Sequence, residues 1–139
     1  MVCLNEDKIK LANENDDVLG IISGNPSVLG DSAHEYWQSM YLKDKFGRII
    51  YDKDPESPSG TKERLNPAYD PNKNYIAREF RPEWSAVGLV GKLYARDDGT
   101  CKPNCYAKPI NGILTHSDER TSIRVMKRTD EDIVYVFIK

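Results

Sequence analysis

The feature that most constrains this sequence is a pair of short apolar runs, residues 123–128 (IRVMKR) and 133–138 (IVYVFI). Both runs are rich in β-branched and aromatic side chains, which are enriched in strands. The polar segment between them, residues 129–132 (TDED), supplies residues that are common in turns. The pattern therefore predicts an antiparallel β-hairpin.

Two other segments carry strand signals. Residues 18–22 (VLGII) form a short apolar run bounded by polar and turn residues, which predicts a buried strand. Residues 84–96 alternate small or polar with apolar side chains and predict the central strand, closed by a hairpin turn at residues 97–100 (DDGT). Gly88 and Gly91 within this strand indicate a bulge or the close approach of another backbone.

The middle of the chain has a different character. Residues 41–51 predict a second hairpin, because Gly47 can adopt the positive φ of a tight turn. Residues 31–38 (DSAHEYWQ) begin with a capping residue and predict a short helix. Residues 52–74 hold four prolines and little apolar content, so they predict a long exposed loop, either for partner contact or as a tolerated surface insertion.

The predicted fold class is therefore mainly β (α+β), an antiparallel, hairpin-rich domain with one or two short helices and the long loop 52–74. A chain of 139 residues fits one domain with one ordinary core, and we predict a single domain over residues 1–139. The formal net charge is -2 with both signs mixed along the chain, which argues against a nucleic-acid partner. No stretch approaches the roughly 20 apolar residues of a membrane helix, so no membrane partner is expected.

Three cysteines, Cys3, Cys101 and Cys105, do not suggest a disulfide framework, and a reducing compartment fits them best. Cys101 and Cys105 bracket a turn-like Lys-Pro-Asn segment and would hold zinc only if two more ligands came from elsewhere. His34 and His116 are the only histidines. The spacing favours a loop with two small thiols, and we predict no metal site.

Carboxylates are the main route to hydrolytic chemistry in this sequence, because it lacks a Ser-His-Asp order, a nucleophile elbow and a phosphate loop. A carboxyl kept neutral by burial can act as an acid while an ionised neighbour activates water. The catalytic candidates are Asp31, Glu83, Asp97 and Asp98. Each has a structural alternative, which is a helix cap for Asp31, turn residues for Asp97 and Asp98, and an ion pair with Arg81 for Glu83.

Arg78, Arg81 and Lys92 are candidates for binding a nucleotide or another anion, because guanidinium groups suit bidentate anion contacts. The structural alternative is a set of exposed salt bridges.

Six segments occur in an order found in one known family. They are VLGIISGNP (18–26), GDSA (30–33), NYIAREFRPEW (74–84), VGLVGK (87–92), RDDGTC (96–101) and RVMK (124–127), with Trp37 as a further match. In these segments the chain resembles the intramolecular-chaperone (IMC) autoproteolytic peptidase domain, found at the C-terminus of phage and prophage β-helical tail spikes. The resemblance extends from about residue 4 to residue 139.

This resemblance implies that the domain helps three spike chains find their register and is then released by cutting its own junction to the spike. It implies a homotrimer, the upstream β-helical spike chain as partner, and ATP as a possible cofactor in release. The expected locations are the cytoplasm of the infected or lysogenic host during assembly and, for the parent spike, the virion. A module that gathers three chains first lowers the entropic barrier to closing many non-local contacts.

One departure from the family pattern concerns the cleavage junction. In the family, the junction and a neighbouring acidic segment lie upstream of the position that aligns with Met1. We therefore expect this N-terminally truncated chain to lack the scissile bond and to be unable to cut itself alone, so no nucleophile is assigned and enzyme activity is left open. The alternative function is a non-catalytic trimerisation or host-contact module of a phage or prophage structural protein.

Overall fold

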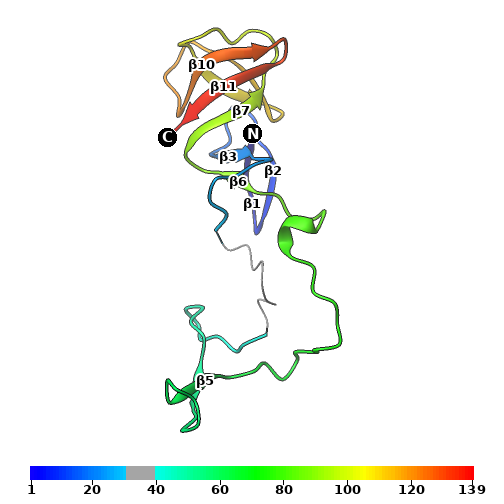
Figure 1. Cartoon of the computed structure of the whole chain (residues 1–139). Coiled ribbons are helices and arrows are strands. Elements are labelled where there is room, and N and C mark those ends of the chain that lie inside the picture. Colours follow the sequence, from blue (N-terminus) through cyan, green and yellow to red (C-terminus); the bar gives the residue numbers. More distant parts are fainter. Residues whose placement is uncertain (31–39) are drawn as a thin grey trace. The chain divides into compact units, whose positions relative to one another are not determined.

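The predicted C-terminal hairpin is present in the computed structural model of the chain, where β10 pairs antiparallel with β11 (Figure 1). It lies inside a five-stranded antiparallel sheet with the order β7-β11-β10-β8-β9. The strands of this sheet are β7 (Gly91–Arg96), β8 (Tyr106–Ile110), β9 (Ile113–Ser117), β10 (Ile123–Asp130) and β11 (Ile133–Ile138). Alternate residues of β11 are fully buried, as expected when one face of a sheet packs on a core.

The structure describes residues 1–30 and 40–139. Contacts divide the chain into two compact units. Unit 1 comprises residues 1–29 and 85–139, and unit 2 comprises residues 30–84. The helix predicted at residues 31–38 lies outside the described residues. The prediction of a single domain over residues 1–139 stays a prediction.

A second sheet of unit 1 has the order β2-β1-β3-β6. Its strands are β1 (Val2–Asn5), β2 (Lys8–Leu11), β3 (Val18–Ile22) and β6 (Val87–Gly88). The bounds of β3 confirm the strand predicted at residues 18–22. Glu6 adopts a positive φ of 56° in the turn between β1 and β2.

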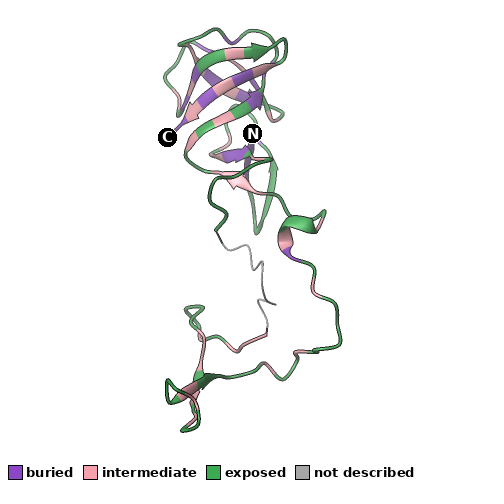
Figure 2. Cartoon of the chain, in the orientation of Figure 1, coloured by how far each residue is buried: buried purple, intermediate pink, exposed green. Residues whose placement is uncertain are grey.

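The core of unit 1 draws residues from both of its sheets. Cys3 and Ile21 of the N-terminal sheet belong to the same buried cluster as Leu114, Val134 and Val136 of the C-terminal sheet. Figure 2 shows buried stretches along the strands of unit 1. The two sheets therefore share one apolar core, which fixes the loops between their strands.

The prediction of one central strand over residues 84–96 is wrong. The run divides into β6 and β7, which belong to different sheets, and β7 lies at a sheet edge. Gly91 has a φ of +115°, and this conformation turns the chain between the two strands. The predicted close approach of another backbone is confirmed at Gly88, because a Cβ added at Gly20 would lie 2.4 Å from the carbonyl oxygen of Gly88. At Gly91 an added Cβ would meet none of the described residues within 4 Å.

The prediction that residues 97–100 form a hairpin turn is also wrong, because the strands on either side of this turn do not pair with each other. Residues 97–100 do form a turn, with Gly99 at a φ of +88°. However, β7 pairs with the distant β11, whereas the following strand β8 pairs with β9 and β10. The turn therefore links two strands that are not neighbours in the sheet.

Unit 2 contains the two-stranded sheet of β4 (Tyr51–Lys53) and β5 (Thr61–Glu63) and the 3₁₀ helix η1 (Arg78–Phe80). The segment predicted as a long exposed loop, 52–74, thus includes a short hairpin, whose turn is closed by the N–H of Asp54 donating to the carbonyl of Gly60. The turn predicted at Gly47 is confirmed by its φ of +79° and by the flanking antiparallel bridge of Lys43 with Ile49.

The fold class is confirmed as mainly antiparallel β. Within residues 1–30 and 40–139, η1 is the only helical element. In the same ranges no helix has the length and apolar character needed to cross a membrane.

Candidate functional site

Asp97 is the only buried carboxylate among the catalytic candidates that the structure describes. It follows the last residue of β7, and its side chain is 0% exposed. Its two oxygens accept hydrogen bonds from Arg128 of β10, with Oδ1 to Nη1 at 3.0 Å and Oδ2 to Nη2 at 2.6 Å. This bidentate geometry is the strongest form of a carboxylate–guanidinium contact.

Hydrogen bonds around Asp97 and Arg128 connect the turn after β7 to the C-terminal hairpin. Oδ2 of Asp97 also accepts the backbone N–H groups of Gly99, at 3.1 Å, and Cys101, at 3.2 Å. Arg128 donates to the carbonyl oxygens of Cys101 at 2.8 Å and Glu131 at 2.6 Å. The hydrogen bond from Asp97 is the main reason that the pKa of Arg128 is raised above its ordinary value. The pair is thus fully engaged in holding the local backbone.

Asp98 forms its side-chain hydrogen bonds within the turn that follows β7. Its Oδ1 accepts the backbone N–H of Thr100 at 3.0 Å and the Thr100 hydroxyl at 2.6 Å. Burial acts to raise the pKa of Asp98, but hydrogen bonds from Thr100 and Thr115 lower it below the ordinary value. An aspartate held ionised in this way is poorly suited to act as a general acid near neutral pH.

The remaining candidates lie apart from Asp97 along the chain. Glu83 is exposed and pairs with Arg81 across 3.7 Å, which is the structural alternative considered for it. Arg78 and Arg81 both lie over the ring of Trp84, at 4.2 and 5.7 Å from its centroid. These residues belong to unit 2, whereas Lys92 is an exposed residue of β7 in unit 1.

Asp31 lies outside the described residues. The structure therefore places Asp97 and Asp98 next to each other in one turn and each in its own hydrogen-bond network. The catalytic and anion-binding roles of all the candidates stay predictions.

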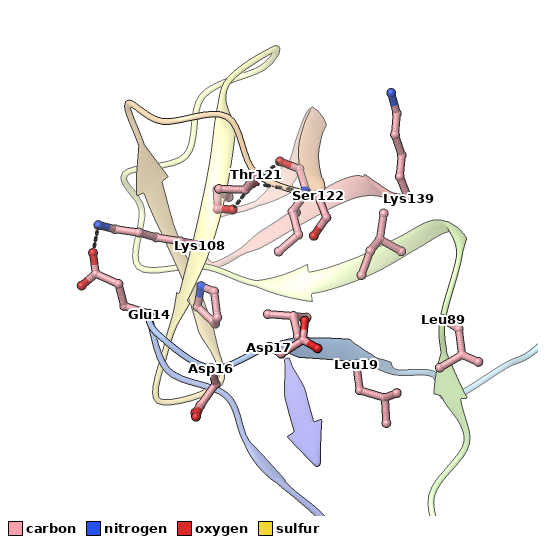
Figure 3. A pocket seen from close by; sticks show the side chains of 14 residues that line it. Glu14, Asp16, Asp17, Leu19, Leu89, Lys108, Thr121, Ser122 and Lys139 are labelled. Carbon is pink, nitrogen blue, oxygen red and sulfur yellow. Dashed lines mark hydrogen bonds and ion pairs between the residues drawn. The ribbon is translucent and has the colours of Figure 1, made fainter.

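A cleft of about 350 Å³ that the sequence did not predict lies within unit 1 (Figure 3). It is lined by the segment before β3, by part of β8 and by the adjoining ends of β10 and β11. Glu14 and Lys108 form an ion pair at one side of it. On another side, the Thr121 hydroxyl donates to the carbonyl of Ala107 at 2.7 Å.

The cleft offers carboxylates, ammonium groups and hydroxyls, and none of the described residues that line it is a histidine or a cysteine. Asp16, another lining residue, has a pKa lowered chiefly by the backbone hydrogen bond from Asn13. Such a surface suits polar contacts with a partner more than nucleophilic catalysis. Sequence reasoning missed the cleft because its polar residues come from separate segments and form no motif.

The cysteine loop lies beside the Asp97 network. Cys101 is buried, and desolvation is the main cause that raises the pKa of its thiol to about 12. In the part of the chain that the structure describes, no group of three or more His, Cys, Asp or Glu side chains is placed to hold a metal ion.

Comparison with known proteins gives a consistent result. The family model described as "Peptidase_G2, IMC autoproteolytic cleavage domain" matches residues 1–133. The preneck appendage protein of Bacillus phage PZA is 39% identical over 119 residues, which cover 83% of this chain and 14% of that protein. The pre-neck appendage protein of Bacillus phage phi29 is 38% identical over 122 residues, with coverage of 85% and 14%. The putative phage-related protein YobO of Bacillus subtilis strain 168 is 39% identical over 134 residues, with coverage of 93% and 16%.

Two solved structures share the fold. The pre-mature bacteriophage phi29 gene product 12 matches with a TM-score of 0.86 and 32% identity, covering 99% of this chain and 19% of that one. The C-terminal fragment of the same gene product matches with a TM-score of 0.81 and 32% identity, covering 99% of this chain and 88% of the fragment. This chain thus spans only a small part of the length of the curated relatives, and that part corresponds to a C-terminal fragment.

Proposed function

This chain belongs to the IMC autoproteolytic cleavage domain family, and from that premise we propose that it gathers three copies of a longer phage or prophage appendage polypeptide and is then released by autoproteolysis. The small share of each relative that the chain matches supports the idea of a longer polypeptide. A trimer of this kind assembles in the cytoplasm of the bacterial host, and the upstream spike segment is its partner in the same polypeptide.

The observation that carries the trimerisation proposal is the apolar surface of unit 2. Within its described residues, 30 and 40–84, Ala77 is the only buried residue. Large apolar side chains of this unit are instead exposed, among them Phe46, Leu65 and Ile76. A segment that buries so little apolar surface cannot offset the entropy of ordering its backbone. Contact with further copies of the chain would supply the missing burial.

The benefit of such a module follows from chain entropy. An elongated appendage forms many contacts between residues far apart in sequence or in different chains, and these contacts form slowly. Trimerisation at one end raises the effective concentration of the three attached segments for one another. Once the appendage has assembled, it no longer needs the contacts that the module provides. The module can then be removed without loss to the appendage.

The oligomeric state tests the first half of the proposal. Light scattering coupled to size-exclusion chromatography should give three times the 15.8 kDa mass of one chain. Leu65→Asp and Ile76→Asp should each shift the protein towards monomer, because they place a charge on the exposed apolar surface of unit 2. Ile113→Asp, at an exposed apolar position of β9 in unit 1, is the matched control and should remain trimeric. A wild-type chain that stays monomeric at high concentration would refute this half.

Autoproteolysis is tested in a chimera. The matching C-terminal segment of the phi29 pre-neck appendage protein is replaced by this chain, and the product is followed on a denaturing gel. We expect two fragments after trimerisation. A trimeric chimera that stays at full length would instead favour the alternative, a non-catalytic trimerisation or host-contact module.

Two variants of the chimera address the candidate carboxylates. Asp98 and Glu83 are exposed, and each already contacts a neighbouring group, so Asp98→Asn and Glu83→Gln should be cleaved to the same extent as the parent chimera. Loss of cleavage in either variant, with the trimer intact, would assign that carboxylate a catalytic role.

A role for ATP in the release of the cleaved domain is a further part of the proposal. The grouping of Arg78 and Arg81 over the ring of Trp84 supports it, because cations beside an aromatic face suit the phosphates and base of a nucleotide. Calorimetry of the trimer with ATP should show saturable heat that is lost in Arg81→Ala. Absence of heat in the wild-type trimer would remove ATP from the proposal.

A further inference from the structure

A cation lies between two aromatic residues on the outer face of the five-stranded sheet. Arg124 of β10 is in register with Tyr106 of β8 on one side and with Phe137 of β11 on the other. Its sequence neighbours Ile123 and Val125 are both buried in the core. Because side chains alternate between the two faces of a sheet, Arg124 and its two aromatic partners share the face that points away from the core.

The side chain of Arg124 is held in place by neutral groups. Its guanidinium lies 4.4 Å from the ring centroid of Tyr106, and its Nε and Nη2 donate to Oδ1 of Asn104 at 3.2 and 2.5 Å. Asn104 is itself fixed, because its N–H donates to the carbonyl of Val125 at 2.8 Å. The positive charge of Arg124 is therefore positioned but not neutralised, and a charge positioned in advance loses less conformational entropy when a ligand binds.

A pocket of about 310 Å³ opens at this place, lined by the cations Arg120, Arg124 and Lys139 and by the aromatic residues Tyr106 and Phe137. It shares Thr121, Ser122 and Lys139 with the cleft of Figure 3, so the two hollows adjoin. The carboxylates of that cleft do not line this pocket, and none of the described side chains around it is acidic. We call it the basic pocket.

The cations of the basic pocket differ from other cations of unit 1 in their pairing. Salt bridges to carboxylates are formed by Lys10, Arg96, Lys108 and Arg128. Within residues 1–30 and 40–139, no salt bridge is formed by Arg120, Arg124 or Lys139. Three positive charges thus surround one pocket without a carboxylate from the chain itself.

We propose that the basic pocket binds an acidic peptide segment of a partner protein. Carboxylates of the segment pair with Arg120 and Arg124, because guanidinium groups suit bidentate carboxylate contacts. Its apolar groups cover Tyr106 and Phe137, and arginine together with aromatic residues is enriched at protein interfaces. A lone carboxylate would leave these aromatic residues uncovered, which favours a peptide. The basic pocket belongs to unit 1, so the inference does not depend on the trimerisation surface proposed for unit 2.

Fluorescence anisotropy of a labelled peptide in which glutamate and leucine alternate tests the proposal on the full chain. We expect saturable binding that weakens as sodium chloride is added, because salt screens the charges. A peptide with glutamine in place of every glutamate should not bind. Arg124→Gln should weaken binding about tenfold or more, because it removes charge-assisted hydrogen bonds. Arg120→Gln should also weaken it, and Arg120 is exposed and forms no salt bridge in the described residues, so this variant should fold normally.

Lys127→Gln is the matched control. Lys127 is also a cation of β10 near an aromatic ring, 5.8 Å from the centroid of Tyr135, but it does not line the basic pocket. Its replacement should leave the affinity within about twofold of the parent. The proposal is overturned if the acidic peptide does not bind saturably, or if both arginine variants bind it as tightly as the parent. Tighter binding of inorganic phosphate than of the peptide would also overturn it.

Discussion

Replacement of Asp97 by alanine should destabilise unit 1 far more than loss of an exposed charged side chain in the same unit, such as Asp132. The carboxylate is 0% exposed and accepts two hydrogen bonds from Arg128 and one each from the N–H groups of Gly99 and Cys101. Breaking a buried ion pair by removing one partner typically costs about 3–5 kcal/mol. Arg128 keeps its contacts to carbonyl oxygens and is 29% exposed to solvent, so we expect a value near the lower end, about 3 kcal/mol.

Asp97→Asn should give a smaller loss, about 1–2 kcal/mol, because the amide oxygen can still accept the backbone N–H groups while the charge is lost. The matched control is Asp132→Ala in the same unit. Asp132 contacts Arg96 across 3.7 Å, and their side chains are 58% and 77% exposed. An exposed pair of this kind contributes little, so the control should lie within about 0.5 kcal/mol of the parent.

Equilibrium unfolding in urea, followed by circular dichroism at one fixed protein concentration, measures these differences. The fixed concentration matters because the stability of an oligomer depends on it. With a slope of about 2 kcal/mol per molar urea, Asp97→Ala should lower the midpoint by about 1.5 M. A loss below about 1 kcal/mol, or one equal to that of Asp132→Ala, would show that the Asp97 network does not hold the turn to the hairpin.

Gly112→Ala should destabilise the protein by about 1–2 kcal/mol, because Gly112 has a φ of +80° and an added Cβ would lie 2.7 Å from Cδ2 of Leu11. Gly24→Ala meets nothing within 4 Å and should be nearly neutral, so equal thermal shifts for the two variants would contradict this expectation. Asp16 should make the free energy of unfolding depend on pH. The hydrogen bond from the N–H of Asn13 holds the pKa of Asp16 in the folded state below its ordinary 3.8. The stabilisation from the ionised Asp16 is therefore complete above the ordinary pKa and is lost as the pH falls through the lower pKa of the folded state. On acidification, the urea midpoint should therefore fall less steeply for Asp16→Asn than for the parent protein. Parallel curves for the two proteins would contradict a contribution from Asp16.

The strands that could be predicted from the sequence are those whose signal is local. The apolar run of residues 18–22 and the C-terminal hairpin carry their own periodicity and turn residues, and both are present as predicted. The run at residues 84–96 carried an equally clear local signal, but its division was missed. Its two halves pair with β3 and β11, and the choice of these partners depends on residues far away in the chain.

In the candidate site too, features with a local signal could be predicted and features that depend on distant residues could not. The pair Asp97-Asp98 was recognisable as turn residues from the sequence alone, and both form side-chain hydrogen bonds within the turn. Arg128, the partner of Asp97, was missed because 31 positions separate the two residues. One signal was available in retrospect, since an acidic residue that becomes buried requires a cationic partner, and Arg128 stands within a strand of the hairpin.

Unit 1 is built from two stretches that are separated in the sequence, and this limits when it can fold during translation. Strands β1, β2 and β3 are synthesised first, but their sheet is completed by β6 and their core by side chains of the later sheet. The first 29 residues must therefore wait, without their core, while the inserted unit 2 and the following strands are translated. Any copy-to-copy encounter that needs a finished unit 1 can therefore begin only after residues 85–139 have emerged from the ribosome.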